Sequence, residues 1–247
     1  MEYNNKKFFD ETSKFYNSMI NSEAAVERKI KLFTKLKIKG LVTADLGCGS
    51  GVDSIGLSTL GNEVDAFDPS PKMIGLAEKS SVEKRLDIHF HNFAIEDIPK
   101  QFNEKYSFVC SLGNTIANIS PNNLLPAFQR IKDILKLEGR ALIHILNFDL
   151  ILSKKERIIN ITENSEISFV RFYDFFDDHI VFNILKFVKE NPKEHELIST
   201  KLYPHTFATI FTMLNEVNFS GLEFYSNFNF EIFDITRSKD LIISLTR

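Results

Sequence analysis

The stretch Thr43–Gly51 reads T-A-D-L-G-C-G-S-G. It predicts a short apolar strand that runs through Asp45 into three glycines at alternate positions, followed by a helical pattern over the next nine residues. Glycine tolerates positive φ and lets a ligand approach the backbone closely. We therefore expect this turn to place free backbone N–H groups beside a nucleotide-type cofactor at the start of the helix. A tight turn without a ligand is the alternative, but it would need only one glycine.

The spacing of the glycines separates two kinds of cofactor. A dinucleotide fingerprint requires a third glycine at the sixth position, which here is Val52, so an NAD-dependent oxidoreductase is disfavoured. The chain instead has the form D-x-G-x-G-x-G, which resembles the first motif of the class I S-adenosylmethionine-dependent methyltransferases. That resemblance implies S-adenosyl-L-methionine as cofactor, with S-adenosyl-L-homocysteine as product. The cofactor-binding residues that it implies in this stretch are Asp45, Gly47, Cys48, Gly49 and Gly51.

Composition limits the class of protein. The 247 residues, 43% of them hydrophobic and 24 of them Phe, are enough for one α/β domain with a sizeable core. The formal net charge of −3 gives no sign of a phosphate-binding surface, so we expect no nucleic-acid partner. The N-terminus lacks the apolar segment of a signal peptide, and no stretch approaches the roughly 18 apolar residues of a membrane span. We expect a cytoplasmic protein without membrane association.

Cysteine and histidine spacing predicts neither a disulfide nor a metal site. Cys48 and Cys110 are the two cysteines, and neither has the spacing of a metal ligand. The six histidines form no H-x-x-x-H pattern or Cys/His cluster. His89 and His91 share one face of a predicted strand, which is weak grounds for a metal pair.

Strand and helix patterns alternate through the middle of the chain. Strands are predicted at 41–46, 63–68, 87–92, 106–112 and 140–146, with helices at 52–60, 71–79 and 121–137. This alternation predicts a doubly wound, mostly parallel sheet whose ligand site lies beyond the carboxyl ends of the strands. Later strands at 221–225 and 241–245 bring the expected number to seven, in a Rossmann-like α/β fold.

We predict one methyltransferase-like domain over residues 1–247 with four parts. Residues 1–40, with helical patterns at 6–16 and 22–36, form an N-terminal helical cover, and 41–150 form the cofactor-binding core. Residues 151–204 form an antiparallel insertion of long strands at 158–174, 180–189 and 194–203, which could cover the site. Residues 205–247 add a helix at 206–217 and the strands that complete the sheet.

The second strand ends at Asp68, 21 residues after Gly47, in E-V-D-A-F-D-P-S-P-K-M-I. An acid at this strand tip can accept hydrogen bonds from both hydroxyls of a ribose. The alternative is that Asp68 only begins the Asp-Pro-Ser-Pro turn and caps the next helix. The methyltransferase resemblance extends through this segment, and it implies that Pro69 and Met73 also lie at the cofactor, with Met73 against the adenine.

The third strand continues as H-F-H-N-F-A-I-E-D-I-P. The family usually has an acid here that binds the adenine amino group, and alignment puts Ala94 at that position. Adenine would then be held by the backbone of residues 93–95, including Ile95, or by the side-chain amide of Asn92.

The fourth strand, Y-S-F-V-C-S-L-G-N-T-I-A-N-I, resembles a segment of the glycine and sarcosine N-methyltransferases. The resemblance implies that Leu112 lies beside the sulfonium of the cofactor and that Asn114 orients the acceptor, because an amide offers both a donor and an acceptor. An Asn that merely completes a turn is the alternative. After the fifth strand, Leu146 stands where those enzymes have an arginine that binds the substrate carboxylate. Leucine cannot pair with a carboxylate, which argues against glycine as substrate.

The resemblance implies methyl transfer from S-adenosylmethionine to a small-molecule acceptor, and we expect the methylated atom to be an amine nitrogen. Tyr16 matches a tyrosine that often reaches the methionine end of the cofactor in this family. No residue is identifiable as a general base, and the oligomeric state is not predicted. A catalytically inactive S-adenosylmethionine-binding partner or regulatory protein remains the alternative, because Ala94 and Leu146 depart from the family pattern.

Overall fold

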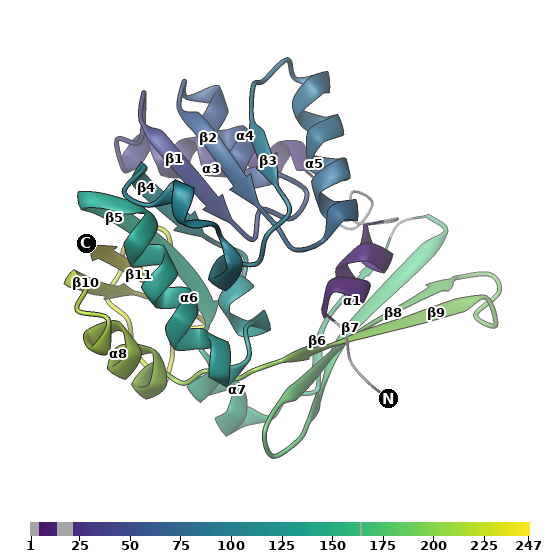
Figure 1. Cartoon of the computed structure of the whole chain (residues 1–247). Coiled ribbons are helices and arrows are strands. Elements are labelled where there is room, and N and C mark those ends of the chain that lie inside the picture. The colour runs from purple at the N-terminus through teal and green to yellow at the C-terminus, as the bar shows by residue number, and fades with distance from the viewer. Residues whose placement is uncertain (1–4, 14–21, 164) are drawn as a thin grey trace.

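The computed structural model describes residues 5–13, 22–163 and 165–247 and places them in two β-sheets with helices around the larger one (Figure 1). The α-helices are α1 (Asn5–Thr12), α3 (Ser22–Lys35), α4 (Val52–Thr59), α5 (Pro71–Glu83), α6 (Pro121–Ile134), α7 (Phe148–Lys154) and α8 (Phe207–Glu216). Short 3-10 helices are η1 (Ile95–Asp97), η2 (Lys100–Phe102) and η3 (Thr115–Asn118). The strands are β1 (Val42–Leu46), β2 (Glu63–Phe67), β3 (His89–His91), β4 (Tyr106–Ser111), β5 (Leu135–Leu146), β6 (Ile158–Glu163), β7 (Ile167–Phe175), β8 (Ile180–Val188), β9 (His195–Leu202), β10 (Ser220–Tyr225) and β11 (Asp240–Thr246).

The larger sheet has seven strands in the order β10-β11-β5-β4-β1-β2-β3. Strands β1 to β5 pair in parallel, whereas β11 runs antiparallel to both β5 and β10. Because β1 lies between β2 and β4, the order of the strands reverses beside β1, and such a switch point opens a crevice at the carboxyl ends of the strands. The structure confirms the predicted doubly wound, mostly parallel sheet of seven strands.

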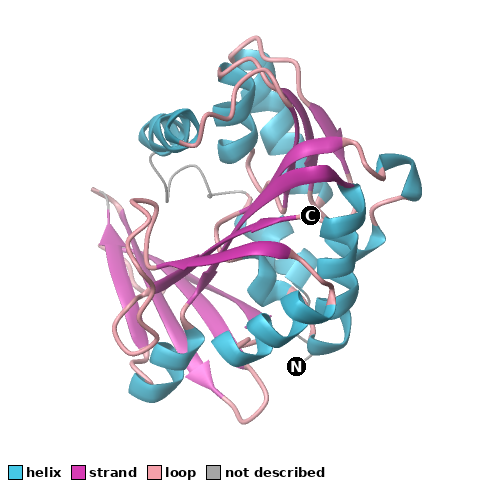
Figure 2. Cartoon of the chain, turned by 90° about the vertical axis from the view of Figure 1, so that its left-hand side faces the viewer, coloured by secondary structure: helices cyan, strands magenta, loops and turns pink. Residues whose placement is uncertain are grey.

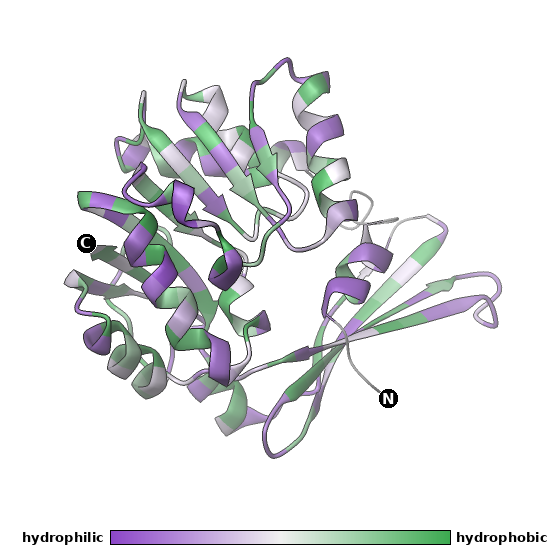
Figure 3. Ribbon diagram, in the orientation of Figure 1, coloured by the Kyte–Doolittle hydropathy of each residue, from purple (hydrophilic) through white to green (hydrophobic). Residues whose placement is uncertain are grey.

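Helices cover both faces of this sheet. On one face, α3 and α4 contribute buried apolar side chains, Phe33 and Leu57 among them, to one core cluster. On the other face, α6 and α8 form a second cluster with residues such as Phe128 and Leu214. The hydropathy colours show the same division, because green residues concentrate on the strands and purple ones on the outer sides of helices such as α6 (Figure 3). Within the described ranges, no helix combines the length and apolar character that crossing a membrane would require.

The inserted segment forms a separate antiparallel sheet in the order β6-β7-β8-β9 (Figure 2). The sequence predicted one long strand over 158–174, but the structure has two, β6 and β7, which pair as antiparallel neighbours. The polar run E-N-S-E at 163–166 divides the two apolar stretches, so each strand can pair with the other instead of continuing as one. The predicted antiparallel insertion is therefore present with four strands.

Other elements of the structure also differ from the sequence prediction. The helix expected to reach residue 137 ends at Ile134, because Leu135 already pairs in parallel with Tyr106 on β4. The sequence analysis also missed α7, whose first turn is capped by the Asn147 side chain accepting a hydrogen bond from the Leu150 N–H. Helix α1 covers only the first part of the predicted helix at 6–16, and Tyr16 lies outside the described residues.

Candidate functional site

The turn after β1 contains three glycines with positive φ: 74° at Gly47, 53° at Gly49 and 84° at Gly51. Residues other than glycine rarely adopt such a backbone conformation. A Cβ at position 47 would lie 2.3 Å from a side-chain carbon of Thr115, and a Cβ at position 51 would lie 2.9 Å from the Cβ of Ala77. Gly49 has open space instead. Glycine is therefore required at positions 47 and 51 by the close approach of Thr115 and Ala77 as well as by φ, and at position 49 by φ alone.

The expectation of free backbone N–H groups in this turn is wrong. The N–H groups of Gly47 and Cys48 both donate to the carbonyl of Phe67, at 2.8 and 3.0 Å. The Gly51 N–H donates to the Cys48 carbonyl at 2.9 Å, and the Gly49 N–H donates to a carboxylate oxygen of Asp68 at 2.9 Å. The alternating glycines therefore allow the turn to pair with the end of β2 and with Asp68.

Asp68 joins the glycine turn to the next helix. Its carboxylate accepts a hydrogen bond from the Gly49 N–H through Oδ2 and, at 2.8 Å, from the Ser70 N–H through Oδ1. Burial raises the pKa of Asp68, although these two N–H donors favour the charged form. Each carboxylate oxygen can accept a second hydrogen bond. Asp68 therefore makes the turn contacts that the alternative interpretation predicted. Its oxygens still have the acceptor capacity that ribose binding requires.

Asp45 lies beneath the turn and does not face the crevice. Its carboxylate is 1% exposed and accepts a hydrogen bond of 2.5 Å from the Ser54 hydroxyl of α4. Burial, followed by the nearby charge of Asp53, raises its pKa to about 7. Burial also raises the pKa of Cys48, which keeps that residue a neutral thiol. We assign Asp45 to holding α4 against β1, because it is buried and is not among the residues that line the three cavities.

Three adjoining cavities follow the carboxyl ends of the strands. The turn cavity, of about 160 Å³, is bounded by the glycine turn, and the edge cavity, of about 390 Å³, lies beside η1. The inter-sheet cavity, of about 450 Å³, lies between the ends of β4 and β5 and the four-stranded sheet. Phe9 of α1 and Asn118 of η3 line all three. The cavities therefore form one composite crevice whose parts meet at these two side chains.

Most of the predicted cofactor residues meet in this crevice. The turn cavity is lined by Gly47, Cys48, Gly49, Asp68, Pro69, Met73 and Leu112. The edge cavity is lined by Pro69 and by all three residues at 93–95, including Ala94 and Ile95. Asn92, the proposed substitute for the missing acid, instead donates to the Asp68 carbonyl at 2.8 Å and is not among the residues that line the cavity. The geometry therefore favours the backbone of 93–95 over Asn92 for adenine.

Asn114 lines the inter-sheet cavity together with Leu146. It adopts a left-handed conformation with φ of 68°, and its Oδ1 accepts a hydrogen bond of 3.0 Å from the Leu146 N–H. The side chain thus fixes the end of β5, as a turn residue would. It also stands where the sequence analysis placed an acceptor-binding residue.

Sequence reasoning missed the two side chains at the centre of the crevice. Phe9 belongs to α1, which lies between α5 and the four-stranded sheet (Figure 1). Helix α1 is held by Asn5, which accepts from the Thr200 hydroxyl at 2.7 Å, and by Asp10, which accepts from the Ser70 hydroxyl at 2.6 Å. Asn118 follows Asn114 by four residues, and this helical spacing was a signal that could have identified it.

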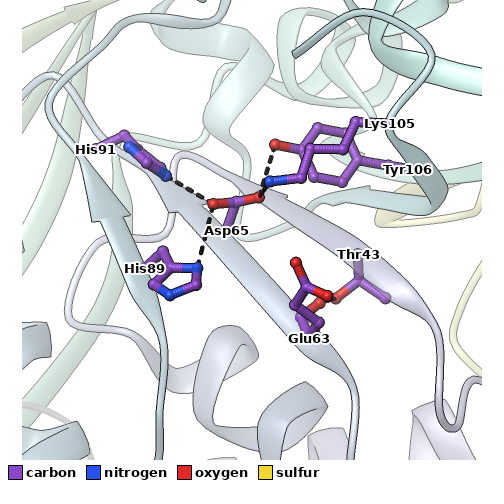
Figure 4. Close-up of polar contacts among 7 residues, drawn as sticks. All are labelled: Thr43, Glu63, Asp65, His89, His91, Lys105 and Tyr106. Atoms are coloured by element: carbon purple, nitrogen blue, oxygen red, sulfur yellow. Dashed lines mark hydrogen bonds and ion pairs between the residues drawn. The ribbon is translucent and has the colours of Figure 1, made fainter. Parts of the chain in front are cut away.

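A second polar cluster is centred on Asp65 of β2 and includes residues on or next to β3 and β4; its members line none of the three cavities (Figure 4). The buried Asp65 carboxylate is 2.6 Å from the Lys105 ammonium, 2.7 Å from His91 Nε2 and 3.0 Å from the Tyr106 hydroxyl. These contacts lower the pKa of Asp65 although its burial opposes them. We assign the cluster to holding the edge of the sheet together. Among the described residues, no group of three or more His, Cys, Asp or Glu could hold a metal ion.

Comparison with known proteins identifies the domain around the crevice. Residues 44–139 match the family model described as "Methyltransferase domain". A probable S-adenosylmethionine-dependent methyltransferase from Saccharomyces cerevisiae is 33% identical over 139 residues, which are 56% of this chain and 45% of that protein. The part of the chain that surrounds the crevice is therefore similar to S-adenosylmethionine-dependent methyltransferases. Human glycine N-methyltransferase is 31% identical over 125 residues, which are 44% of this chain and 42% of that enzyme. The chain thus spans less than half of either relative.

Solved methyltransferase structures share the whole fold at low sequence identity. The methyltransferase CcbJ from Streptomyces caelestis superposes with a TM-score of 0.83 at 16% identity, covering 98% of both chains. A methyltransferase from Clostridium acetobutylicum superposes with a TM-score of 0.76 at 16% identity, covering 97% of both. The shared fold therefore includes the four-stranded inserted sheet as well as the methyltransferase core.

The crevice fits the family's cofactor, S-adenosylmethionine. The turn cavity combines the Asp68 carboxylate with the apolar side chains of Met73 and Leu112. The edge cavity adds flat apolar walls from Pro69 and Phe93. A carboxylate with spare acceptor capacity suits a sugar diol, and apolar walls suit a base. These residues are the ones that would hold the nucleoside.

Proposed function

We propose that the protein transfers a methyl group from S-adenosylmethionine to the amine nitrogen of a small molecule bound in the inter-sheet cavity. The observation that carries this proposal is the continuity of the crevice. Gly113, Phe9 and Asn118 line both the turn cavity and the inter-sheet cavity. A cofactor in one and an acceptor in the other would therefore meet at the end of β4.

The inter-sheet cavity suits a small organic acceptor. Its volume of about 450 Å³ lies in the usual range of roughly 300–1,000 Å³ for small-molecule sites. Its walls are mostly apolar and include Phe8, Phe182 and Ile184. The relative that supports an amine is glycine N-methyltransferase, and a sugar N-methyltransferase shares the fold with a TM-score of 0.64 at 13% identity.

The residues that line the inter-sheet cavity could accelerate the reaction by positioning the acceptor and by excluding water. Bound S-adenosylmethionine would supply an electrophilic methyl group on its sulfonium. The described residues that line the inter-sheet cavity include no carboxylate and no imidazole. Burial raises the pKa of Tyr173, which lines this cavity, to about 12, so its hydroxyl stays protonated near neutral pH. The acceptor amine must therefore lose its proton without a basic side chain from these walls.

The test is calorimetric titration with S-adenosylhomocysteine, followed by transfer of labelled methyl groups to a panel of amines. Asp68→Asn should weaken binding of S-adenosylhomocysteine by about 10- to 100-fold, because one acceptor oxygen is replaced by an N–H₂ group facing a backbone donor. Asp87→Asn is the matched control, since Asp87 is exposed and lies outside the crevice. No heat from the wild-type protein would reject the proposed cofactor site. Binding without transfer to any amine would reject the proposed reaction.

A further inference from the structure

A fourth cavity borders the inter-sheet cavity next to α7. This α7 cavity, of about 250 Å³, is lined by Leu146, Leu150, Ile151, Lys154, Glu156, Ile158, Ile159, Tyr173 and Lys239. Three of these residues, Leu146, Ile159 and Tyr173, also line the inter-sheet cavity. Within the described ranges, none of the nine lines the turn cavity or the edge cavity. The α7 cavity therefore extends the proposed acceptor site away from the cofactor.

The walls of the α7 cavity are apolar next to the inter-sheet cavity and charged at the surface. Tyr173, at the border between the two cavities, is 6% exposed. On β6, Ile159 is 41% exposed and Ile158 is 62% exposed. The charged residues of this cavity are all exposed: Lys154, Glu156 and Lys239. Exposed apolar side chains around a hollow are typical of a ligand-binding groove, and the apolar chain of a ligand would cover them here.

Hydrogen bonds within the protein hold the walls of this cavity. The Asn147 N–H donates to the Lys239 carbonyl at 3.0 Å, and the Asn147 side chain accepts from the Leu150 N–H at 3.3 Å, which fixes the start of α7. On the opposite wall, the Tyr173 N–H donates to the Arg157 carbonyl at 2.7 Å. A cavity whose walls are already ordered costs a ligand less to occupy than one that must first form.

We propose that the acceptor is an elongated amine whose nitrogen lies beside Gly113, at the end of β4, and whose apolar chain continues past Leu146 and Tyr173 into the α7 cavity. This inference rests on the proposed function, because it concerns the acceptor of the same reaction. The two cavities, of about 450 and 250 Å³, share apolar walls along this path. The charged rim is hydrated, and removing such groups from water is unfavourable. The apolar part of the acceptor therefore ends at the rim, and the α7 cavity sets its length.

The test measures chain-length selectivity by calorimetric titration in the presence of saturating S-adenosylhomocysteine. The probes are butylamine, hexylamine, octylamine and decylamine, which share one amine group and differ only in the number of methylene groups. Each methylene group that leaves water should tighten binding about three- to fourfold. We expect the dissociation constant to fall about tenfold or more from butylamine to octylamine, and the gain to stop where the chain reaches the charged rim.

Ile158→Asn removes one apolar wall of the α7 cavity and touches no other cavity. It should weaken binding of octylamine about fivefold or more and change binding of butylamine less than twofold, because the short chain ends within the inter-sheet cavity. Leu150→Gln, on α7, should give the same result from the opposite element. Ile161→Asn is the matched control, since Ile161 lies on the same strand, is 61% exposed and lines none of the four cavities. It should keep the length selectivity of the wild type.

Three results would overturn the inference: no gain in affinity from butylamine to octylamine in the wild type, unchanged length selectivity in both Ile158→Asn and Leu150→Gln, or an equal loss of selectivity in Ile161→Asn. Methyl transfer to butylamine without any gain for longer chains would overturn the inference and leave the proposed function standing. Failure of the wild type to bind S-adenosylhomocysteine would count against the proposed function itself, so the two failures are distinguishable.

Discussion

The two sides of the crevice are constructed in different ways. On the side of the seven-stranded sheet, short turns between strands and helices place glycines, backbone carbonyls and Asp68 within a few residues of one another in the sequence. On the side of the four-stranded sheet, the walls are side chains from separate strands, such as Arg171 opposite Ile184 and Asn160. The first side depends on backbone conformation, and the second depends on strand register. Substitutions on the first side are therefore expected to act on turn conformation, and those on the second side on the packing of strands.

The largest effect is expected from Gly47→Ala, on the turn side. The new Cβ would overlap the Thr115 side chain at 2.3 Å, and alanine at φ of 74° is strained by about 1–2 kcal/mol. We expect affinity for S-adenosylhomocysteine to fall at least about 100-fold in calorimetric titration. Gly61→Ala is the control, because its φ of 77° carries the same strain in open space. Equal losses in both variants would show that strain alone, and not the contact with Thr115, controls binding.

The second prediction concerns the pH dependence of stability through Asp45. Its pKa in the folded protein, about 7, exceeds the ordinary value of 3.8, so the folded state binds the proton more tightly than the unfolded chain. The stability from this group is complete below about pH 4 and is lost as pH rises through about 7. The wild type should therefore lose about 2 kcal/mol or more of its free energy of unfolding, relative to Asp45→Asn, when the pH is raised from 5 to 8. If the difference in free energy of unfolding between wild type and variant stays constant between these pH values, the raised pKa of Asp45 is contradicted.

Ser70→Ala tests the link between α1 and the turn side. The Ser70 hydroxyl accepts from the Met73 N–H at 3.1 Å, capping α5, and donates to Asp10 of α1. Loss of this cap should reduce the free energy of unfolding by about 1 kcal/mol, measured by urea denaturation. Ser120→Ala provides the comparison, since Ser120 is at the N-cap of α6 without a capping hydrogen bond. Similar losses in the two variants would argue against a stabilising role for the Ser70 hydroxyl.

The smallest effect is expected on the inserted-sheet side, from Tyr173→Phe. Because the hydroxyl of Tyr173 remains protonated, removing it should lower the methyl-transfer rate by less than about threefold and leave binding of S-adenosylhomocysteine unchanged. Steady-state kinetics with the best amine of the panel would check this. A loss of 100-fold or more at constant cofactor affinity would make Tyr173 a catalytic residue.

The sequence predicted the turn side well because its signals are local. The glycines, Asp68 and the Ser70-Pro71 start of α5 lie in short segments whose residues prefer these turns and caps. The prediction of free N–H groups failed at Gly47, Cys48 and Gly49, whose N–H groups donate to the end of β2 and to Asp68. The sequence of the turn does not contain this pairing, because it depends on the position of the adjacent strand.

The inserted side was less predictable for a physical reason. The pattern of the segment 158–174 fits one strand or two, and only pairing between β6 and β7 brings Asn160 opposite Arg171. Likewise, Phe9 could be assigned to a helix but not to a cavity, because all but two of the residues that line the inter-sheet cavity with it, Phe8 and Thr12, lie more than a hundred positions away in the sequence. Such contacts depend on the register between strands and on the packing of α1, which the local pattern does not contain.

The position of α1 makes one aromatic ring common to the whole crevice. Phe9 borders all three cavities, and the helix that carries it is tied to β9 and to the start of α5. A change at Phe9 would therefore alter all three cavities at once, and it would affect the binding of cofactor and of acceptor together.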